Sequence, residues 1–310
     1  MPVALACPAS LKGVLTAVEA AEALREGLRD ADVLPLADGG EGTLDALAAA
    51  RGGEWRSADV EDAFGRPRRA RWLLLPDGTA AVEAAEAIPL DPSRLDVQAA
   101  SSRGLGALIR AVGSPRRLLV ALGGTATMDA GAGLLDALEA LPAPTRVACD
   151  VDARLVDAPR LFGPQKGASS DDVALLEERF RASGLPDLPG GGAAGGLGAA
   201  LASLGAELVP GAALVLDELG FDPSPYRLVV TGEGTVDATT TRGKAPAEVA
   251  RRCAAAGVRC VVFGGRVVEP LPGVETVPLS GDPARAREDL VELGARLVGL
   301  DLVELLRERL

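Results

Sequence analysis

The 310-residue sequence contains no histidine and no asparagine. Without histidine, the chain cannot form a Ser-His-Asp or Cys-His catalytic group, nor a zinc site with imidazole ligands. Any general base must therefore be a carboxylate, a lysine, a tyrosine or a cysteine. The missing asparagine is typical both of a GC-rich genome and of a thermophile, in which heat-labile residues are avoided, and the sequence does not separate these two explanations.

Long apolar runs are missing as well. No uninterrupted stretch reaches the roughly 18 residues that a membrane-spanning helix needs, so no membrane partner is expected. The first residues lack a basic segment followed by an apolar one, which makes the cytoplasm the expected location. The net charge of −12 would repel a nucleic-acid backbone. The oligomeric state, monomer or homodimer, stays open.

Cysteine is scarce, and its spacing indicates no metal or redox motif. The four cysteines are Cys7, Cys149, Cys253 and Cys260, and no two of them form a C-x-x-C pair. We expect them to be buried, reduced thiols.

Lysine is rare in a chain that is rich in arginine. Only Lys12, Lys166 and Lys244 are lysines among 32 basic residues, and each of them adjoins a glycine. A compact ammonium acts as a point charge on phosphate in a way that the planar guanidinium does not. We therefore expect these three lysines to have a function instead of lying on solvated helix faces.

The pattern of apolar residues predicts an α/β protein. Val3–Cys7 and Val33–Leu36 are predicted strands, and the Thr16–Glu19 capping box predicts a helix between them that ends near Arg29. This alternation favours parallel βαβ units. Further helices are predicted near Gly104–Val112, Ala193–Leu204 and Pro246–Ala256, and further strands at Arg117–Leu122, Tyr226–Thr231 and Arg259–Phe263.

The segment from Trp55 to Glu86 has a different pattern. Two short runs, Arg71–Leu75 and Thr79–Ala84, flank Pro76-Asp77-Gly78, which is a hairpin turn signal. This pattern predicts a partly antiparallel subdomain.

Glycine-rich stretches carry the strongest chemical signal. They are Asp38–Gly42, Gly123–Gly133, Gly163–Gly167, Gly190–Gly198 and Thr231–Asp237. Such loops let backbone amides approach a phosphate, and the neighbouring carboxylates favour Mg²⁺ bound with it. None of them is a Walker A loop or a G-x-G-x-x-G fingerprint after a strand, which disfavours an NAD-dependent enzyme. The acids at Cys149–Asp152 suit metal or hydroxyl binding and suit an exposed strand end equally well.

Eight segments then occur in a set order along the chain. They are Pro8–Gly13, Ala37–Gly42, Leu122–Thr127, Cys149–Asp152, Phe162–Ala168, Ala193–Gly198, Val230–Gly234 and Gly243–Pro246. Together they resemble the signatures of bacterial type I glycerate kinases (glycerate 2-kinases). The resemblance implies phosphorylation of D-glycerate to 2-phosphoglycerate with ATP and Mg²⁺.

The resemblance also implies the domain organisation. It predicts a discontinuous flavodoxin-like parallel-sheet domain over residues 1–57 and 225–310. A second, mixed α/β domain is expected over 58–224, with the active site in the cleft between the two.

The chemistry of the residues in these motifs suggests four groups of site residues. Catalytic residues are expected at Lys12, Asp38, Asp129 and Glu233, and nucleotide-phosphate ligands at Gly123, Gly124, Thr125, Thr127, Lys166 and Lys244. Substrate ligands are expected at Ser10, Glu41 and Arg103, and Mg²⁺ ligands at Asp129 and Asp237.

One departure keeps a second hypothesis open. The family's first signature usually has aspartate where this chain has Ala9. The alternative is a non-catalytic or re-specialised homologue that binds a small anion or nucleotide.

Overall fold

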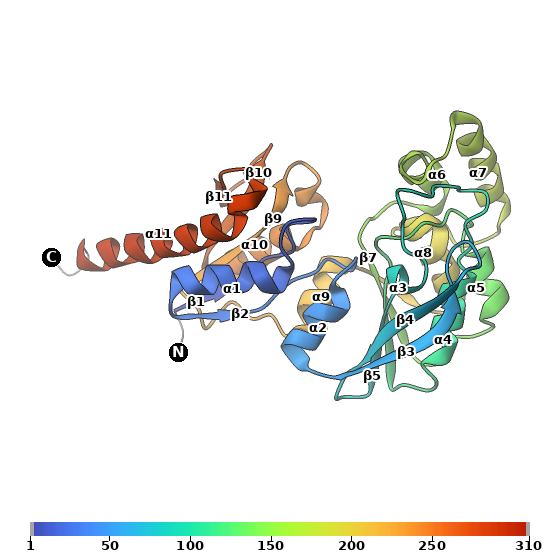
Figure 1. The fold of residues 1–310 in the computed structure, drawn as a ribbon, viewed down its shortest axis with the longest axis horizontal. Coiled ribbons are helices and arrows are strands. Elements are labelled where there is room, and N and C mark those ends of the chain that lie inside the picture. The colour runs from blue at the N-terminus through green and yellow to red at the C-terminus, as the bar shows by residue number, and fades with distance from the viewer. Residues whose placement is uncertain (1–2, 308–310) are drawn as a thin grey trace. The chain divides into compact units, whose positions relative to one another are not determined.

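The computed structural model describes residues 3–307, and the chain forms two compact units, most of whose helices and strands are labelled in Figure 1. One unit combines the chain up to Ala37 with the chain from Leu216 onward, and the other comprises residues 38–215. Residues 38–57 thus lie in the second unit instead of the first, because helix α2 (Thr43–Arg51) packs on β4 and β5 of the second sheet. At the other boundary, residues 216–224 lie in the first unit.

The first unit is a five-stranded parallel sheet in the order β11-β10-β9-β1-β2. Its strands are β1 (Ala4–Ala6), β2 (Ala31–Val33), β9 (Leu228–Val236), β10 (Arg259–Val267) and β11 (Glu275–Pro278). Its helices are α1 (Ala17–Leu28), α10 (Ala245–Ala256) and α11 (Ala286–Arg307), with short 3-10 turns at Thr240–Arg242 and Pro283–Arg285. Numbered by their order within the unit, the strands run 2-1-3-4-5, which confirms the flavodoxin-like prediction.

Both faces of this sheet are covered by helices. Val261 and Phe263 on β10 pack into the cluster formed with α1 and α11, whereas Val262 between them packs beside α10. Successive strand residues point to opposite faces, so a strand buried on both sides is a continuous apolar run. This is why Arg259–Phe263 could be recognised as a strand from the sequence.

Helix α1 begins where the sequence predicted. The Thr16 hydroxyl accepts a hydrogen bond from the Glu19 amide, and the Glu19 carboxylate accepts one from the Thr16 amide. Strand β2 is displaced: it spans Ala31–Val33 instead of the predicted 33–36. The chain beyond it still follows the first strand, because the Leu34 amide donates to the Ala6 carbonyl and the Leu36 amide to the Pro8 carbonyl.

The second unit is a mixed sheet in the order β3-β4-β5-β6-β7-β8. Its strands are β3 (Glu54–Glu61), β4 (Pro67–Leu74), β5 (Thr79–Glu83), β6 (Arg117–Ala121), β7 (Thr145–Cys149) and β8 (Glu207–Pro210). Strands β3 to β5 are antiparallel and β5 to β8 are parallel. The predicted turn at Pro76–Gly78 joins β4 to β5, with Gly78 at φ 83° as such a turn requires.

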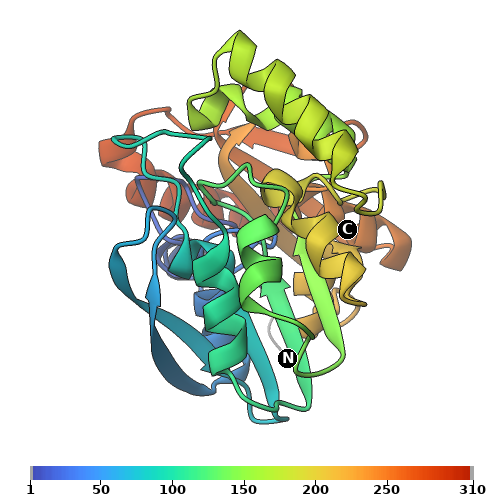
Figure 2. The same ribbon diagram turned by 90° about the vertical axis from the view of Figure 1, so that its right-hand side faces the viewer.

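Helices cover both faces of this sheet too. They are α3 (Ala84–Ala87), α4 (Arg103–Ala111), α5 (Ala132–Ala137), α6 (Ala158–Phe162), α7 (Ser170–Ala182) and α8 (Ala193–Ser203), with 3-10 turns at Leu155–Asp157 and Pro164–Lys166. Figure 2 shows α4, α5 and α8 over one face, and α2 packs on the opposite face. Helix α9 (Gly211–Glu218) spans the boundary of the two units. None of the helices in the described part of the chain combines the length and the apolar character that crossing a membrane requires.

The crossing of α1 and α11 gives a test of the first unit. A Cβ added at Gly27 would overlap the Val291 carbonyl oxygen, whereas one added at Gly299 would meet no atom within 4 Å. We expect Gly27→Ala to lower the free energy of unfolding by about 2 kcal/mol, because the two helices must separate. Gly299→Ala, the control on α11, should raise it by up to about 1 kcal/mol through helix propensity. Urea denaturation measures both, and a stabilised Gly27→Ala protein would contradict the crossing.

Candidate functional site

In the first unit, the predicted site residues lie in the carboxyl-terminal part of β9 and in the segments that follow β1 and β9. Ser10 and Lys12 follow β1, and Glu233 lies on β9. A Cβ at Gly234 would lie 3.5 Å from the Leu11 Cα, so the β9 backbone packs against this loop. Strands β1 and β9 are neighbours at the point where the strand order reverses, which is where open parallel sheets bind ligands.

Lys244 and Glu233 form the centre of this group. The Lys244 ammonium lies 3.2 Å from the Glu233 carboxylate, which also accepts a hydrogen bond from the Thr240 hydroxyl at 2.7 Å. The Lys244 side chain remains 32% exposed, so the ion pair does not close it off from an anionic ligand. Lys244 also forms the N-cap position of α10, where the positive end of the helix adds to its charge.

The other charged residues of this loop group differ in their partners. Asp237 accepts hydrogen bonds from the hydroxyl and amide of Thr239, which hold the pKa of the Asp237 carboxyl below its usual range. Ser10 is half-buried. Lys12 is exposed, and no carboxylate pairs with it within the described residues. Lys12 is therefore a cation available to a ligand.

In the second unit, two glycine loops meet beyond the carboxyl end of β6. The Gly123 amide donates to the Gly39 carbonyl at 3.1 Å, and a Cβ at Gly123 would lie 2.5 Å from the Gly40 Cα. Gly124 is exposed and has φ 75°. The sequence-predicted loops Asp38–Gly42 and Gly123–Thr127 are thus in contact.

Lys166 supports the second loop from inside. It is only 5% exposed, and its ammonium donates to the Thr127 carbonyl at 2.9 Å and lies 3.5 Å from the Thr125 hydroxyl. Burial lowers the pKa of Lys166 to about 8, although Asp150 and Asp129 act in the opposite direction. Thr125 and Thr127 are themselves 3% and 0% exposed. This geometry favours support of the loop by all three residues over the direct contact with phosphate that the sequence suggested.

Asp129 joins the starts of two helices. Its carboxylate accepts hydrogen bonds from the amide and hydroxyl of Ser102, which precedes α4, and from the amides of Gly131 and Gly133 at the start of α5. Four donors occupy its lone pairs. The geometry therefore favours a structural role for Asp129 over the metal binding or catalysis that the sequence suggested.

The remaining predicted residues of this unit lie at its surface. Arg103 is the exposed first residue of α4, and Glu41 is exposed in the first glycine loop. Asp38 is half-buried, and its carboxylate has no hydrogen-bond partner within residues 3–307. Of the carboxylates predicted in this unit, Asp38 is thus better placed than Asp129 to accept a proton or a cation.

Two features of the second unit were not found from the sequence. Glu83, at the end of β5, is 5% exposed and accepts a hydrogen bond from the Leu44 amide of α2 at 2.7 Å. Ala194 and Ala130 both have positive φ, and their segments are joined by a hydrogen bond from the Ala130 amide to the Gly195 carbonyl. The sequence contained a signal only for the second feature, because left-handed backbone was to be expected in the Gly190–Gly198 stretch.

No three cysteine or acidic side chains in the described part of the chain are grouped so that they could hold a metal ion. Magnesium in phosphoryl-transfer sites commonly binds through only one or two carboxylates together with phosphate oxygens. The donor chemistry of Asp38 and Asp237 fits that mode, whereas the four hydrogen bonds to Asp129 do not.

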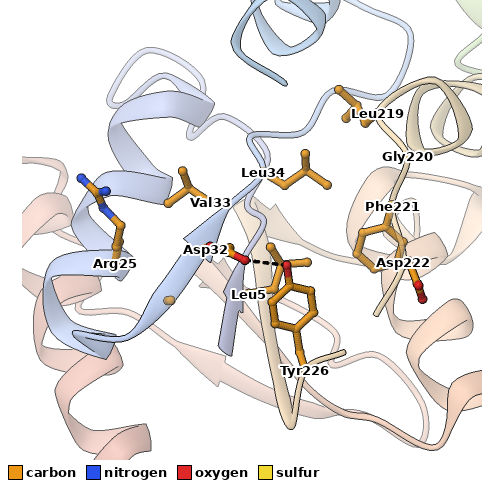
Figure 3. A pocket seen from close by; sticks show the side chains of 11 residues that line it. Leu5, Arg25, Asp32, Val33, Leu34, Leu219, Gly220, Phe221, Asp222 and Tyr226 are labelled. Carbon is orange, nitrogen blue, oxygen red and sulfur yellow. Dashed lines mark hydrogen bonds between the residues drawn. The ribbon is translucent and has the colours of Figure 1, made fainter. Parts of the chain in front are cut away.

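A separate cavity of about 370 Å³ runs along β2, the edge strand of the first sheet (Figure 3). The Tyr226 hydroxyl crosses it to donate a hydrogen bond to Asp32 at 2.8 Å, and Phe221 and Leu34 supply apolar walls. None of the sequence-predicted site residues lines this cavity. We therefore do not assign the candidate chemistry to it.

Comparison with known proteins gives consistent matches. The model of the glycerate kinase family matches residues 4–143 and 139–277. Glycerate 2-kinase of Escherichia coli K12 is 37% identical over 303 residues, covering 78% of this chain and 80% of that protein. Glycerate kinase of Bacillus subtilis 168 is 34% identical and is covered to 84%, as is this chain. A crystal structure provisionally described as glycerate kinase 2 of Salmonella typhimurium LT2 matches with a TM-score of 0.83 and 29% identity, covering 98% of this chain and 99% of that one.

The buried carboxylate of Glu83 gives a test by pH. Burial raises its pKa from 4.5 to about 7, against hydrogen bonds from the Leu44 and Gly42 amides. Between those values the folded chain holds a proton that the unfolded chain has lost, so stability falls as pH rises. We expect the free energy of unfolding to fall by up to about 3 kcal/mol more between pH 5 and 8 in the natural protein than in Glu83→Gln.

Denaturation at the two pH values measures this difference. The control is Glu139→Gln, which removes an exposed carboxylate of the same unit and should leave the pH dependence unchanged. Parallel pH curves for the natural protein and Glu83→Gln would contradict the assignment.

Proposed function

The chain belongs to the glycerate kinase family, and from this premise we propose that it transfers the γ-phosphoryl group of ATP to D-glycerate, giving 2-phosphoglycerate. The observation that carries the proposal is the placement of Lys12 and Lys244. Lys12 follows β1 and Lys244 follows β9, the two neighbouring strands of the parallel sheet at which the strand order reverses. Both side chains keep their ammonium groups accessible. Phosphoryl transfer depends mainly on positioning and on neutralising phosphate charge, which such cations supply.

In the first unit, Lys12 and Lys244 bind the anionic groups of the substrates. Glu233 orients Lys244, since the ion pair at 3.2 Å fixes the ammonium beside the turn that starts α10. Asp237 would hold Mg²⁺ through its carboxylate, and the ion supplies further charge neutralisation when it is bound with ATP. Ser10 contributes a hydroxyl for a polar group of the substrate.

In the second unit, the exposed backbone at Gly124 forms the anion-binding part of the loop, and Gly123 holds the loop against Gly39. Lys166, Thr125 and Thr127 support the loop from inside. Asp38 accepts the proton of the substrate hydroxyl. The hydroxyl oxygen forms a bond to the γ-phosphorus as the bond from phosphorus to the β–γ bridging oxygen breaks, so ADP is the leaving group.

Turnover is the direct test. Purified protein should consume ATP only when both D-glycerate and Mg²⁺ are present, and phosphorus NMR should show 2-phosphoglycerate. Omitting either one is the internal control. Saturable binding of nucleotide and glycerate without turnover would overturn the proposal and support the non-catalytic alternative that Ala9 suggested.

Lysine chemistry gives a second test. Lys244→Arg keeps the charge but replaces a compact ammonium paired to Glu233 with a wider planar group. We expect kcat/KM to fall at least about tenfold, or about 1.4 kcal/mol of transition-state stabilisation. Arg251→Lys on the same helix is the matched control, because Arg251 is 65% exposed and pairs only locally with Glu248. Equal activity of the two variants would show that a lysine is not required at position 244.

A further inference from the structure

We propose that Glu83 is a positioning residue for the glycine loop Asp38–Gly42: by accepting the first amides of α2, it sets where Asp38 is held. Glu83 is the last residue of β5, beside Ala121 of β6 in the register of the sheet. Glu83 therefore lies at the carboxyl ends of β5 and β6, where the Gly123–Thr127 loop begins. The inference rests on the proposed function for its effect on catalysis, but the contact can be tested separately.

The start of α2 needs an acceptor from outside the helix. Its N-cap residue is Gly42, which has φ 91° and no side chain to cap the first amides. The Glu83 carboxylate is this acceptor. Its Oε1 lies 2.7 Å from the Leu44 nitrogen, and the Gly42 amide also donates a hydrogen bond to the carboxylate. A carboxylate at a helix N-terminus is further favoured by the helix dipole.

The loop before α2 transmits this constraint to the site. Gly39 and Gly40 contact Gly123, through the hydrogen bond at 3.1 Å and the close approach of the two backbones. A Cβ at Gly211 would overlap the Asp38 carbonyl oxygen, so the chain is also confined at that end. Only a short run of residues separates Asp38 from the amides that Glu83 holds. A shift of α2 therefore displaces Asp38 relative to Gly123.

The charges around Glu83 leave the backbone amides as its main support. Asp45 on α2 and Glu86 on α3 both raise its pKa, and Arg71 on β4 is held by the Glu86 carboxylate at 2.7 Å. Burial is the larger cause and brings the pKa to about 7. When ionised, both oxygens can accept from the helix; when protonated, one oxygen carries a hydrogen and must donate. The ionised carboxylate therefore makes the stronger hydrogen bonds to the loop, even though its burial lowers the overall stability of the fold as pH rises.

The test compares kcat/KM for D-glycerate between pH 6 and pH 8 in the natural protein and in Glu83→Gln. Glutamine resembles the protonated acid, with one acceptor oxygen and one donor group. We expect the ratio of the natural protein to the variant to rise from near one at pH 6 to about tenfold at pH 8, as the natural carboxylate ionises. If Glu83 only stabilised the fold, its replacement would change the melting temperature but leave this ratio independent of pH. A ratio that does not change with pH would therefore overturn the proposal.

Amide hydrogen exchange provides a readout that does not depend on turnover. At pH 8, the amides of residues 42–46 should exchange faster in Glu83→Gln than in the natural protein, whereas Glu139→Gln should match the natural protein. If the natural protein does not phosphorylate D-glycerate, the proposed function fails while exchange still decides the contact. If Glu83→Gln does not fold, Glu83→Asp replaces it in this experiment. The shorter aspartate keeps the charge but cannot reach both amides. Unchanged exchange in the folded variant would overturn the proposal.

Discussion

The contact between Gly40 and Gly123 is the constraint on which the second unit's loops depend. The two backbones can approach this closely because Gly123 has no side chain, since a Cβ at Gly123 would lie 2.5 Å from the Gly40 Cα. The contact fixes the loop after β6 and the loop before α2 against each other. Gly124, next to this contact, is exposed and presents bare backbone because it has no side chain.

Charged side chains hold these loops by pairing with the backbone instead of with opposite charges. Lys166 donates to the Thr127 carbonyl, Glu83 accepts from the Leu44 amide, and Asp129 accepts from the amides of Gly131 and Gly133. A charge-assisted hydrogen bond is stronger than a neutral one, and a buried charge without a partner is costly. Each of these hydrogen bonds therefore stabilises one conformation of its loop. Lys12 and Lys244 differ from them in remaining accessible to solvent.

Much of the first unit could be predicted because its signals are local. The Thr16–Glu19 capping box places the start of α1, and the apolar run at Arg259–Phe263 identifies a strand covered on both faces. The turn at Pro76–Gly78 identified the antiparallel pair β4 and β5 of the second unit in the same way. The predicted position of strand β2 was wrong by a few residues. The apolar residues beyond Val33 remain hydrogen-bonded to the segment that starts at β1, but the strand itself ends at Val33.

The three lysines could be identified as candidate functional residues from the sequence, because only three of the 32 basic residues are lysines and each of them adjoins a glycine. The sequence did not indicate that Lys166 is buried while Lys12 is exposed, because burial depends on how distant segments pack. Asp129 and Asp38 looked equivalent as acids beside glycine loops, yet one is saturated by four donors from two helix starts. Glu83 had no signal, because the amide that it accepts from belongs to Leu44, 39 residues earlier in the chain. Burial and hydrogen-bond saturation depend on such distant neighbours, and a local pattern of residues does not contain them.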